Sequence, residues 1–166
     1  DGRTIKKIAR YQQFRAVHKS IERIKSGSDK KSKSGVVWHT QGSGKSLTMV
    51  FLTLKIRRDI ELRDYKMVFI TDRTQLDSQL TATFQNTQEE TIYHASSVKE
   101  LKDILKSDSS NIVTAMVQKF QESAHENEFP VLNESEKIIV LADEAHRTQY
   151  GTLGAAINIG LPNASK

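Results

Sequence analysis

Apolar residues follow two patterns along this chain, one with helical spacing and one of short consecutive runs. The helical spacing opens the chain and predicts an amphipathic helix over residues 5–24, with apolar positions at Ile8, Tyr11, Phe14, Val17, Ile21 and Ile24. The consecutive runs are typical of strands that helices cover on both faces. They predict strands at residues 35–40, 67–71, 111–117 and 137–142.

Further stretches with helical character separate these runs, and we expect helices at residues 45–58, 74–84, 97–106 and 149–158. The alternation of strands and helices predicts an α/β fold with a mostly parallel sheet and helices on both of its faces. Because 166 residues suffice for one ordinary core, we expect a single domain over residues 1–166.

Two local features refine this expectation. Residues 26–34 contain only Gly, Ser, Asp and Lys, which predicts a flexible, solvated linker within the domain. Trp38 falls inside the first expected strand, so we expect it in the core rather than on a surface that stacks nucleic-acid bases.

Composition narrows the functional class only slightly. No run approaches the roughly 18 apolar residues of a membrane span, and the first ten residues are too polar for a secretory signal, which favours a cytoplasmic protein. The chain has no cysteine, so disulfides and thiolate metal sites are excluded. A net charge of +5 is compatible with a polyanionic partner without identifying one.

The most specific motif joins the first expected strand to the helix at 45–58 and reads HTQGSGKS over residues 39–46. A strand, a glycine-rich loop and a helix form a phosphate-binding loop, in which backbone N–H groups and the helix N-terminus attract phosphate oxygens. Lys45 would reach the β and γ phosphates, and the Ser46 hydroxyl would bind Mg²⁺. The candidate nucleotide contacts are Thr40, Gln41, Gly42, Ser43, Gly44, Lys45 and Ser46.

This motif departs from the consensus at its first position, where His39 replaces a glycine. The alternative interpretation is an ordinary turn rich in glycine and serine. Such a turn does not account for a lysine and a hydroxyl placed directly after Gly44, so we favour the nucleotide site.

Acidic residues follow the last expected strand, where the sequence reads DEAH over residues 143–146. Carboxylates at this end of a parallel strand face the crevice in which α/β sheets bind ligands. Asp143 would hold Mg²⁺, Glu144 would activate the attacking water, and His146 would sense the γ phosphate. The alternative is a helix N-cap with an acidic first turn, which we would favour for an isolated acidic pair.

Together these motifs resemble those of superfamily 2 helicases and translocases, and other segments resemble the motor subunits of type I restriction enzymes. These are DRTQLDSQL at 72–80, TAMVQKF at 114–120 and the continuation RTQYG at 147–151. The segment around Gln13 resembles the element that reads adenine, with Gln12 as the weaker candidate. The resemblance runs from about residue 8 to residue 164.

The resemblance implies a RecA-like lobe of an ATP-dependent translocase that moves along double-stranded DNA. Its implied partners are methyltransferase and specificity subunits, and its implied parent chain carries a second RecA-like lobe, a nuclease domain and, after residue 164, the strand of motif III. Because arginine fingers from the second lobe are worth about 10³ to 10⁵ in rate, we expect little ATP hydrolysis by this chain alone.

The same resemblance places DNA contacts at Arg73, Gln79, Thr114 and Gln118. Alternatives from the residues themselves are a satisfied strand hydroxyl for Thr114, and an ion pair with Asp72 or Asp77 for Arg73. Two other functions remain open at this point. One is a different superfamily 2 helicase, and the other is a nucleotide-regulated binding module that performs no hydrolysis, against which Glu144 argues.

Overall fold

The computed structural model describes residues 7–40, 42–71, 92–116, 130–143 and 152–166. Within these residues a four-stranded sheet has the order β2-β3-β1-β4, and every pairing in it is parallel. The strands are β1 (Lys66–Thr71), β2 (Ile92–His94), β3 (Ile112–Met116) and β4 (Ile138–Ala142). The predicted parallel sheet is therefore confirmed, whereas the predicted helix at 74–84 lies outside the described residues.

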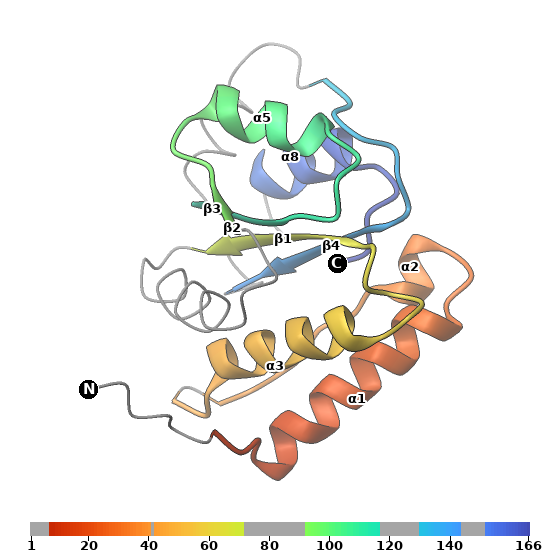
Figure 1. The fold of residues 1–166 in the computed structure, drawn as a ribbon, viewed down its shortest axis with the longest axis vertical. Helices are drawn as coiled ribbons and strands as arrows, with labels where there is room; N and C mark the ends of the chain where they lie inside the picture. Colours follow the sequence, from red (N-terminus) through yellow and green to blue (C-terminus); the bar gives the residue numbers. More distant parts are fainter. Residues whose placement is uncertain (1–6, 41, 72–91, 117–129, 144–151) are drawn as a thin grey trace.

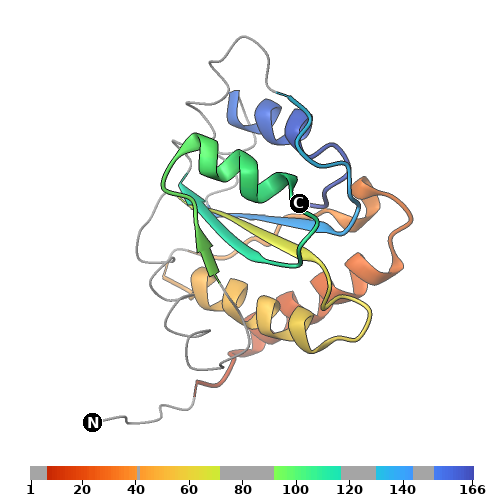
Figure 2. The same ribbon diagram turned by 45° about the horizontal axis from the view of Figure 1, so that its top comes forward.

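Helices cover both faces of the sheet, as predicted. In Figures 1 and 2, α1 (Tyr11–Ser26) and α3 (Lys45–Arg58) lie on one side, and α5 (Val98–Lys106) and α8 (Thr152–Gly160) lie on the other. Because side chains alternate along β1, the core is divided into two parts, one against each pair of helices. Met67 and Phe69 pack with α1 and α3, whereas Val68 and Ile70 pack with α5 and α8. No described helix is long and apolar enough to cross a membrane.

Helix α1 begins later than the apolar spacing predicted and buries a different face. Its buried residues are Gln13, Val17, Ile21 and Ile24. Ile8, Tyr11 and Phe14, which belong to the predicted stripe, are exposed. The helix thus packs against α3 through its central and C-terminal turns, and a polar side chain occupies the first buried position.

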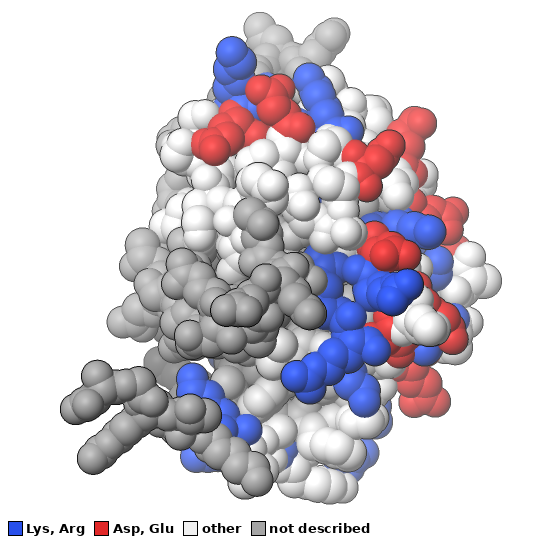
Figure 3. Space-filling model, viewed as in Figure 1, with Lys and Arg blue, Asp and Glu red and all other residues white. Residues whose placement is uncertain are grey.

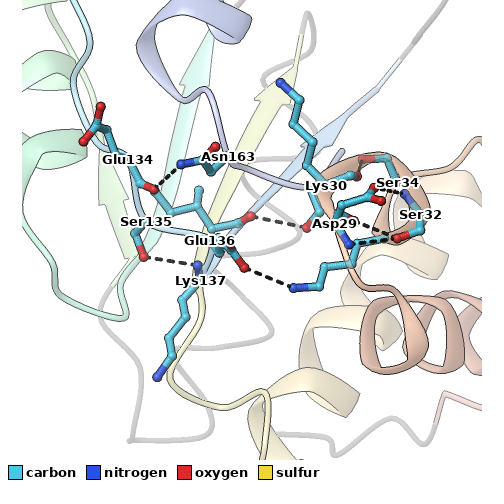
Figure 4. A network of polar contacts seen from close by, with 12 residues as sticks. Asp29, Lys30, Ser32, Ser34, Glu134, Ser135, Glu136, Lys137 and Asn163 are labelled. Atoms are coloured by element: carbon cyan, nitrogen blue, oxygen red, sulfur yellow. Dashed lines mark hydrogen bonds and ion pairs between the residues drawn. The ribbon is translucent and has the colours of Figure 1, made fainter.

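Residues 26–34 are mostly exposed, as predicted, but they are not a featureless linker. They contain the short helix α2 (Lys30–Lys33), which Asp29 caps by accepting a hydrogen bond from the Ser32 N–H at 2.8 Å. Lys33 forms an ion pair with Glu136 at 3.6 Å, which Figure 4 shows from close by. Lys30 donates to the Pro162 carbonyl at 2.7 Å. Spacing shows which residues favour a turn, but not the distant partners that hold it.

The predicted strand at 35–40 is wrong, and so is the expected burial of Trp38. Residues 35–40 belong to no strand, and Trp38 is 90% exposed. Strand-forming residues become a strand only when a neighbour pairs with their backbone. Among the described residues, that neighbour is present only at Gly35, whose N–H donates to the Lys166 carbonyl at 2.8 Å.

A buried lysine joins the start of β1 to the end of α5. The Lys66 ammonium donates to the carbonyls of Ile104 at 2.6 Å and Ser107 at 2.5 Å. Lys66 is buried, and this burial lowers the pKa of its ammonium, with Asp108 opposing the shift. The charge remains favourable here because the last carbonyls of a helix carry partial negative charge and otherwise have no partner.

We therefore predict that Lys66→Met lowers the free energy of unfolding by about 1 to 3 kcal/mol, because buried carbonyls lose their donor. Urea denaturation of both proteins measures this change. Lys99→Met is the matched control, since Lys99 is exposed on α5 and should change stability little. Equal stability of the Lys66→Met protein and the unsubstituted chain would contradict the capping role.

Candidate nucleotide-binding site

The loop before α3 has the backbone that a phosphate-binding loop requires. Gly42 and Gly44 have φ angles of +76° and +87°, in the left-handed region that favours glycine. Between them the chain turns tightly, with the Ser43 N–H donating to the Thr40 carbonyl at 3.2 Å and the Ser43 hydroxyl donating to the same oxygen at 2.6 Å.

Helix α3 begins directly after this turn, with Gly44 as its N-cap and no side-chain cap from any described residue. Lys45 and Ser46 occupy its first turn and are half-buried. The arrangement places a cation, a hydroxyl and the positive end of a 14-residue helix together. It can therefore attract the phosphates of a nucleotide.

Gln13 reaches this loop from α1 and is only 2% exposed. Its side-chain amide nitrogen donates to the Gly44 carbonyl at 3.1 Å, and its amide oxygen accepts from the Arg10 N–H at 2.9 Å. A β-carbon on Gly44 would lie 2.6 Å from that nitrogen. Gln13 rather than the exposed Gln12 therefore contacts the loop, and residue spacing does not indicate this bond to Gly44.

His39 stands where the motif normally has glycine, and its ring also touches the loop. The His39 Nδ1 atom lies 3.3 Å from the Ser43 hydroxyl oxygen. The side chain of the residue that departs from the consensus thus contacts the turn. This contact was not predicted, because spacing alone does not show which way the ring points.

Asp143 follows β4 and lies at the predicted end of the sheet. Asp143 is only 8% exposed, and its N–H donates to the Ile70 carbonyl of β1 at 3.0 Å. In Figure 1 the carboxyl ends of β1 and β4 lie on the same side of the molecule as the N-terminal end of α3. The fold therefore brings the acidic strand end and the glycine-rich loop to one edge.

Thr114 has the surroundings of a structural strand residue. It lies inside β3, opposite Phe69 and His94 in the neighbouring strands, and is 4% exposed. Its hydroxyl forms a hydrogen bond of 2.8 Å with the His94 Nδ1 atom. This placement favours the satisfied strand hydroxyl over a DNA contact, because a buried hydroxyl with a partner does not face a phosphate backbone.

Several predicted site residues lie outside the residues that the structure describes. They are Gln41 in the loop, the DNA candidates Arg73, Gln79 and Gln118, and the catalytic candidates Glu144 and His146. The described part of the site consists of Gln13, Thr40, Gly42, Ser43, Gly44, Lys45, Ser46 and Asp143.

Comparison with known proteins agrees with this geometry. The family described as SWI2/SNF2 ATPase matches residues 12–166, which is nearly the whole chain. The chain belongs to the SWI2/SNF2 ATPase family. The α/β lobe with its glycine-rich loop is accordingly a RecA-like lobe of the superfamily 2 type.

Two curated relatives of this ATPase lobe are subunits of restriction enzymes. The putative type I restriction enzyme MjaIXP endonuclease subunit of Methanocaldococcus jannaschii is 40% identical over 163 residues, which cover 95% of this chain and 16% of the relative. The type I restriction enzyme HindI endonuclease subunit of Haemophilus influenzae is 38% identical over 156 residues, covering 90% of this chain and 15% of the relative. The resemblance to type I motor subunits is confirmed, and the chain spans about a sixth of these relatives.

A solved structure supports the fold. It is a nuclease-deletion mutant of the type ISP restriction-modification enzyme LlaGI in complex with a DNA substrate mimic. The likeness has a TM-score of 0.60 at 18% identity and covers 97% of this chain and 17% of that one. At this identity the comparison supports the RecA-like fold alone.

The contact between Gln13 and the loop leads to a first prediction for the site. Gln13→Ala removes two hydrogen bonds of a buried side chain, so the free energy of unfolding should fall by about 1 to 3 kcal/mol. Gln12→Ala, at the exposed neighbouring position, should change it by less than about 0.5 kcal/mol. Urea denaturation compares the two variants, and equal effects would contradict the assignment of Gln13 to the loop.

The two glycines provide a second, matched pair of variants. An alanine at either position must adopt a positive φ, which costs about 1 to 2 kcal/mol. Only Gly44→Ala also brings its β-carbon to 2.6 Å from Gln13, whereas no described residue lies within 4 Å of a β-carbon at Gly42. Gly44→Ala should therefore destabilise the chain more than Gly42→Ala, as thermal unfolding measures.

The clash can be tested separately from the strain. In the double variant Gln13→Ala/Gly44→Ala the side chain that meets the new methyl group is absent. The double variant should lose less stability than the sum of the two single variants, since contacting residues are not additive. Strict additivity would show that the two residues do not touch.

Proposed function

We propose that this chain is the ATP-binding lobe of an ATP-dependent double-stranded DNA translocase, within the endonuclease subunit of a type I restriction enzyme. The proposal rests on the SWI2/SNF2 match and on relatives at 40% and 38% identity that carry that subunit name. Its functional partners would be the methyltransferase and specificity subunits, together with a second RecA-like lobe and a nuclease domain of the parent chain. Such an enzyme acts on DNA in the cytoplasm.

The observation that carries the proposal is the geometry between Gly42 and Ser46. Two glycines in the left-handed region lead directly into a helix that no described side chain caps, and its first turn holds Lys45 and Ser46. Backbone N–H groups in this arrangement bind phosphate oxygens, and the lysine reaches the terminal phosphates of ATP. A binding turn for an uncharged ligand would need neither the cation nor the helix end.

The residues also fit the Mg²⁺ that ATPases use with their nucleotide. The Ser46 hydroxyl and the Asp143 carboxylate supply the hard oxygen ligands that this cation prefers. When bound, the cation neutralises charge on the phosphates. Glu144 would orient the attacking water and accept its proton, His146 would connect the γ phosphate to lobe movement, and Gln13 would meet the adenine.

DNA binding is proposed for Arg73, Gln79 and Gln118, and the burial of Thr114 argues against including it. The overall charge is favourable, since the chain carries 25 basic and 20 acidic residues. Figure 3 shows basic side chains predominating in the lower half of this face, whereas acidic and basic ones are mixed over α5 and along the right edge. Contacts of this kind hold phosphates and read no sequence.

The first test is a calorimetric titration with Mg-ATP. Lys45→Ala should weaken binding at least about tenfold, equivalent to about 1.4 kcal/mol, because it removes the cation that meets the phosphates. Lys55→Ala is the matched control, since this exposed lysine lies on the same helix three turns away from the loop. Equal affinity of the Lys45→Ala and Lys55→Ala variants would refute the phosphate-binding assignment.

Phosphate release with and without duplex DNA tests the second half of the proposal. This chain alone should release phosphate slowly in both cases, because the second lobe is expected to supply the arginine fingers. In the parent enzyme, DNA should accelerate phosphate release, and Lys45→Ala should abolish it. Rapid turnover by the 166-residue chain would instead identify a self-contained ATPase.

A further inference from the structure

Ser43 separates the two glycines of the phosphate loop, so it offers the side chain at the centre of the turn. Gly42 and Gly44 both have φ angles in the left-handed region. Glycine also reaches many other backbone conformations at little cost, so the residues that allow this turn allow it to relax as well. A contact made by the Ser43 side chain can therefore decide how firmly the loop keeps its shape.

The Ser43 side chain is tied to the start of the loop. Its hydroxyl donates to the Thr40 carbonyl at 2.6 Å, and its backbone N–H donates to the same oxygen at 3.2 Å. A phosphate-binding loop directs N–H groups toward the anion, whereas a carbonyl oxygen carries partial negative charge and repels it. The Ser43 hydroxyl thus fixes a carbonyl whose rotation toward the phosphates would oppose binding.

His39 acts on this same hydroxyl, and the direction of its hydrogen bond follows from the network. The Nδ1 atom of His39 lies 3.3 Å from the Ser43 hydroxyl oxygen. A serine hydroxyl has one hydrogen and two lone pairs, and here the hydrogen goes to the Thr40 carbonyl. The Ser43 oxygen therefore accepts from His39, which assigns a hydrogen to Nδ1. A relay of two hydrogen bonds runs from the half-buried imidazole through the hydroxyl to the carbonyl.

The next residue of the loop is held by a different side chain. The Gln13 amide nitrogen donates to the Gly44 carbonyl at 3.1 Å, so the consecutive residues Ser43 and Gly44 are each held from outside the turn. Gln13 comes from α1, whereas His39 comes from the segment that leads into the loop. Without the His39 side chain, the hydrogen bond from Gln13 would hold the turn at Gly44 and nothing would restrain the Ser43 hydroxyl from the side of residue 39.

We propose that His39 is a positioning residue of the nucleotide site, which holds the loop in its phosphate-binding shape through the Ser43 hydroxyl. The loop is then ordered before the nucleotide arrives, and ordering it does not reduce the affinity. A glycine at position 39, as in the usual form of the motif, has no side chain that could do this. The inference rests on the proposed function, because it concerns nucleotide binding at the same site.

Calorimetric titration with Mg-ATP tests this role. His39→Ala removes the donor, and the affinity should fall about threefold to tenfold, the range expected for one hydrogen bond between uncharged groups. Thermal unfolding of each variant is the control for folding. Equal Mg-ATP affinity of the His39→Ala variant and the unsubstituted chain would overturn the proposal, whatever the change in stability.

His39→Asn and His39→Gln form a matched pair of polar variants. The amide nitrogen of asparagine lies about as far from the backbone as Nδ1, whereas that of glutamine lies one carbon further out. His39→Asn should therefore bind Mg-ATP nearly as tightly as the unsubstituted chain, and His39→Gln should lose about as much affinity as His39→Ala. A residue that only filled space would give the opposite order, because glutamine is closer to histidine in size, and that order would overturn the proposal.

Ser43→Ala tests whether His39 acts through the hydroxyl. The double variant His39→Ala/Ser43→Ala should bind Mg-ATP no more weakly than Ser43→Ala alone, since residues in one network are not additive. Two losses of affinity that multiply would overturn the proposal. Absence of Mg-ATP binding by the unsubstituted chain would refute the proposed function and this inference with it, whereas binding that does not depend on His39 would overturn this inference alone.

Discussion

A strand within a parallel sheet has to pair its backbone on both edges, and the structure depends on where this requirement is met. β1 satisfies it completely, since β3 and β4 flank it in register. β4 satisfies it on one edge and, among the residues that the structure describes, only around Ser165 on the other. Helices cover a sheet where paired strands present a continuous apolar face, and β1 accordingly packs against helices on both of its faces.

The same requirement explains how the candidate site is assembled. The carboxyl ends of parallel strands lie at the same edge of a sheet. Backbone pairing alone therefore places Asp143 beside the end of β1. The glycine-rich loop is positioned differently, because the chain before it has no strand partner among the described residues beyond Gly35. It depends instead on α3, which continues from it, and on Gln13, which holds its Gly44 carbonyl.

The sequence sufficed for the parts of the fold that local pattern determines. Consecutive apolar runs located β1, β3 and β4 within one residue of their observed starts, and the spacing at 45–58 reproduced α3. The three-residue β2 was missed because it is half exposed and carries no apolar run. The strand expected at 35–40 failed for the opposite reason, since its residues favour a strand but lack a described neighbour.

The site was predictable in its chemistry and less so in its contacts. Glycine, lysine, serine and aspartate are recognisable because phosphate and Mg²⁺ require those groups in that order. The bond from Gln13 to Gly44 and the contact of His39 with Ser43 join residues through the fold or through ring orientation, which spacing does not encode. The same distinction applies to the two helix caps. The Asp29 cap joins neighbouring residues and can be predicted from spacing, whereas the Lys66 cap joins distant ones and cannot.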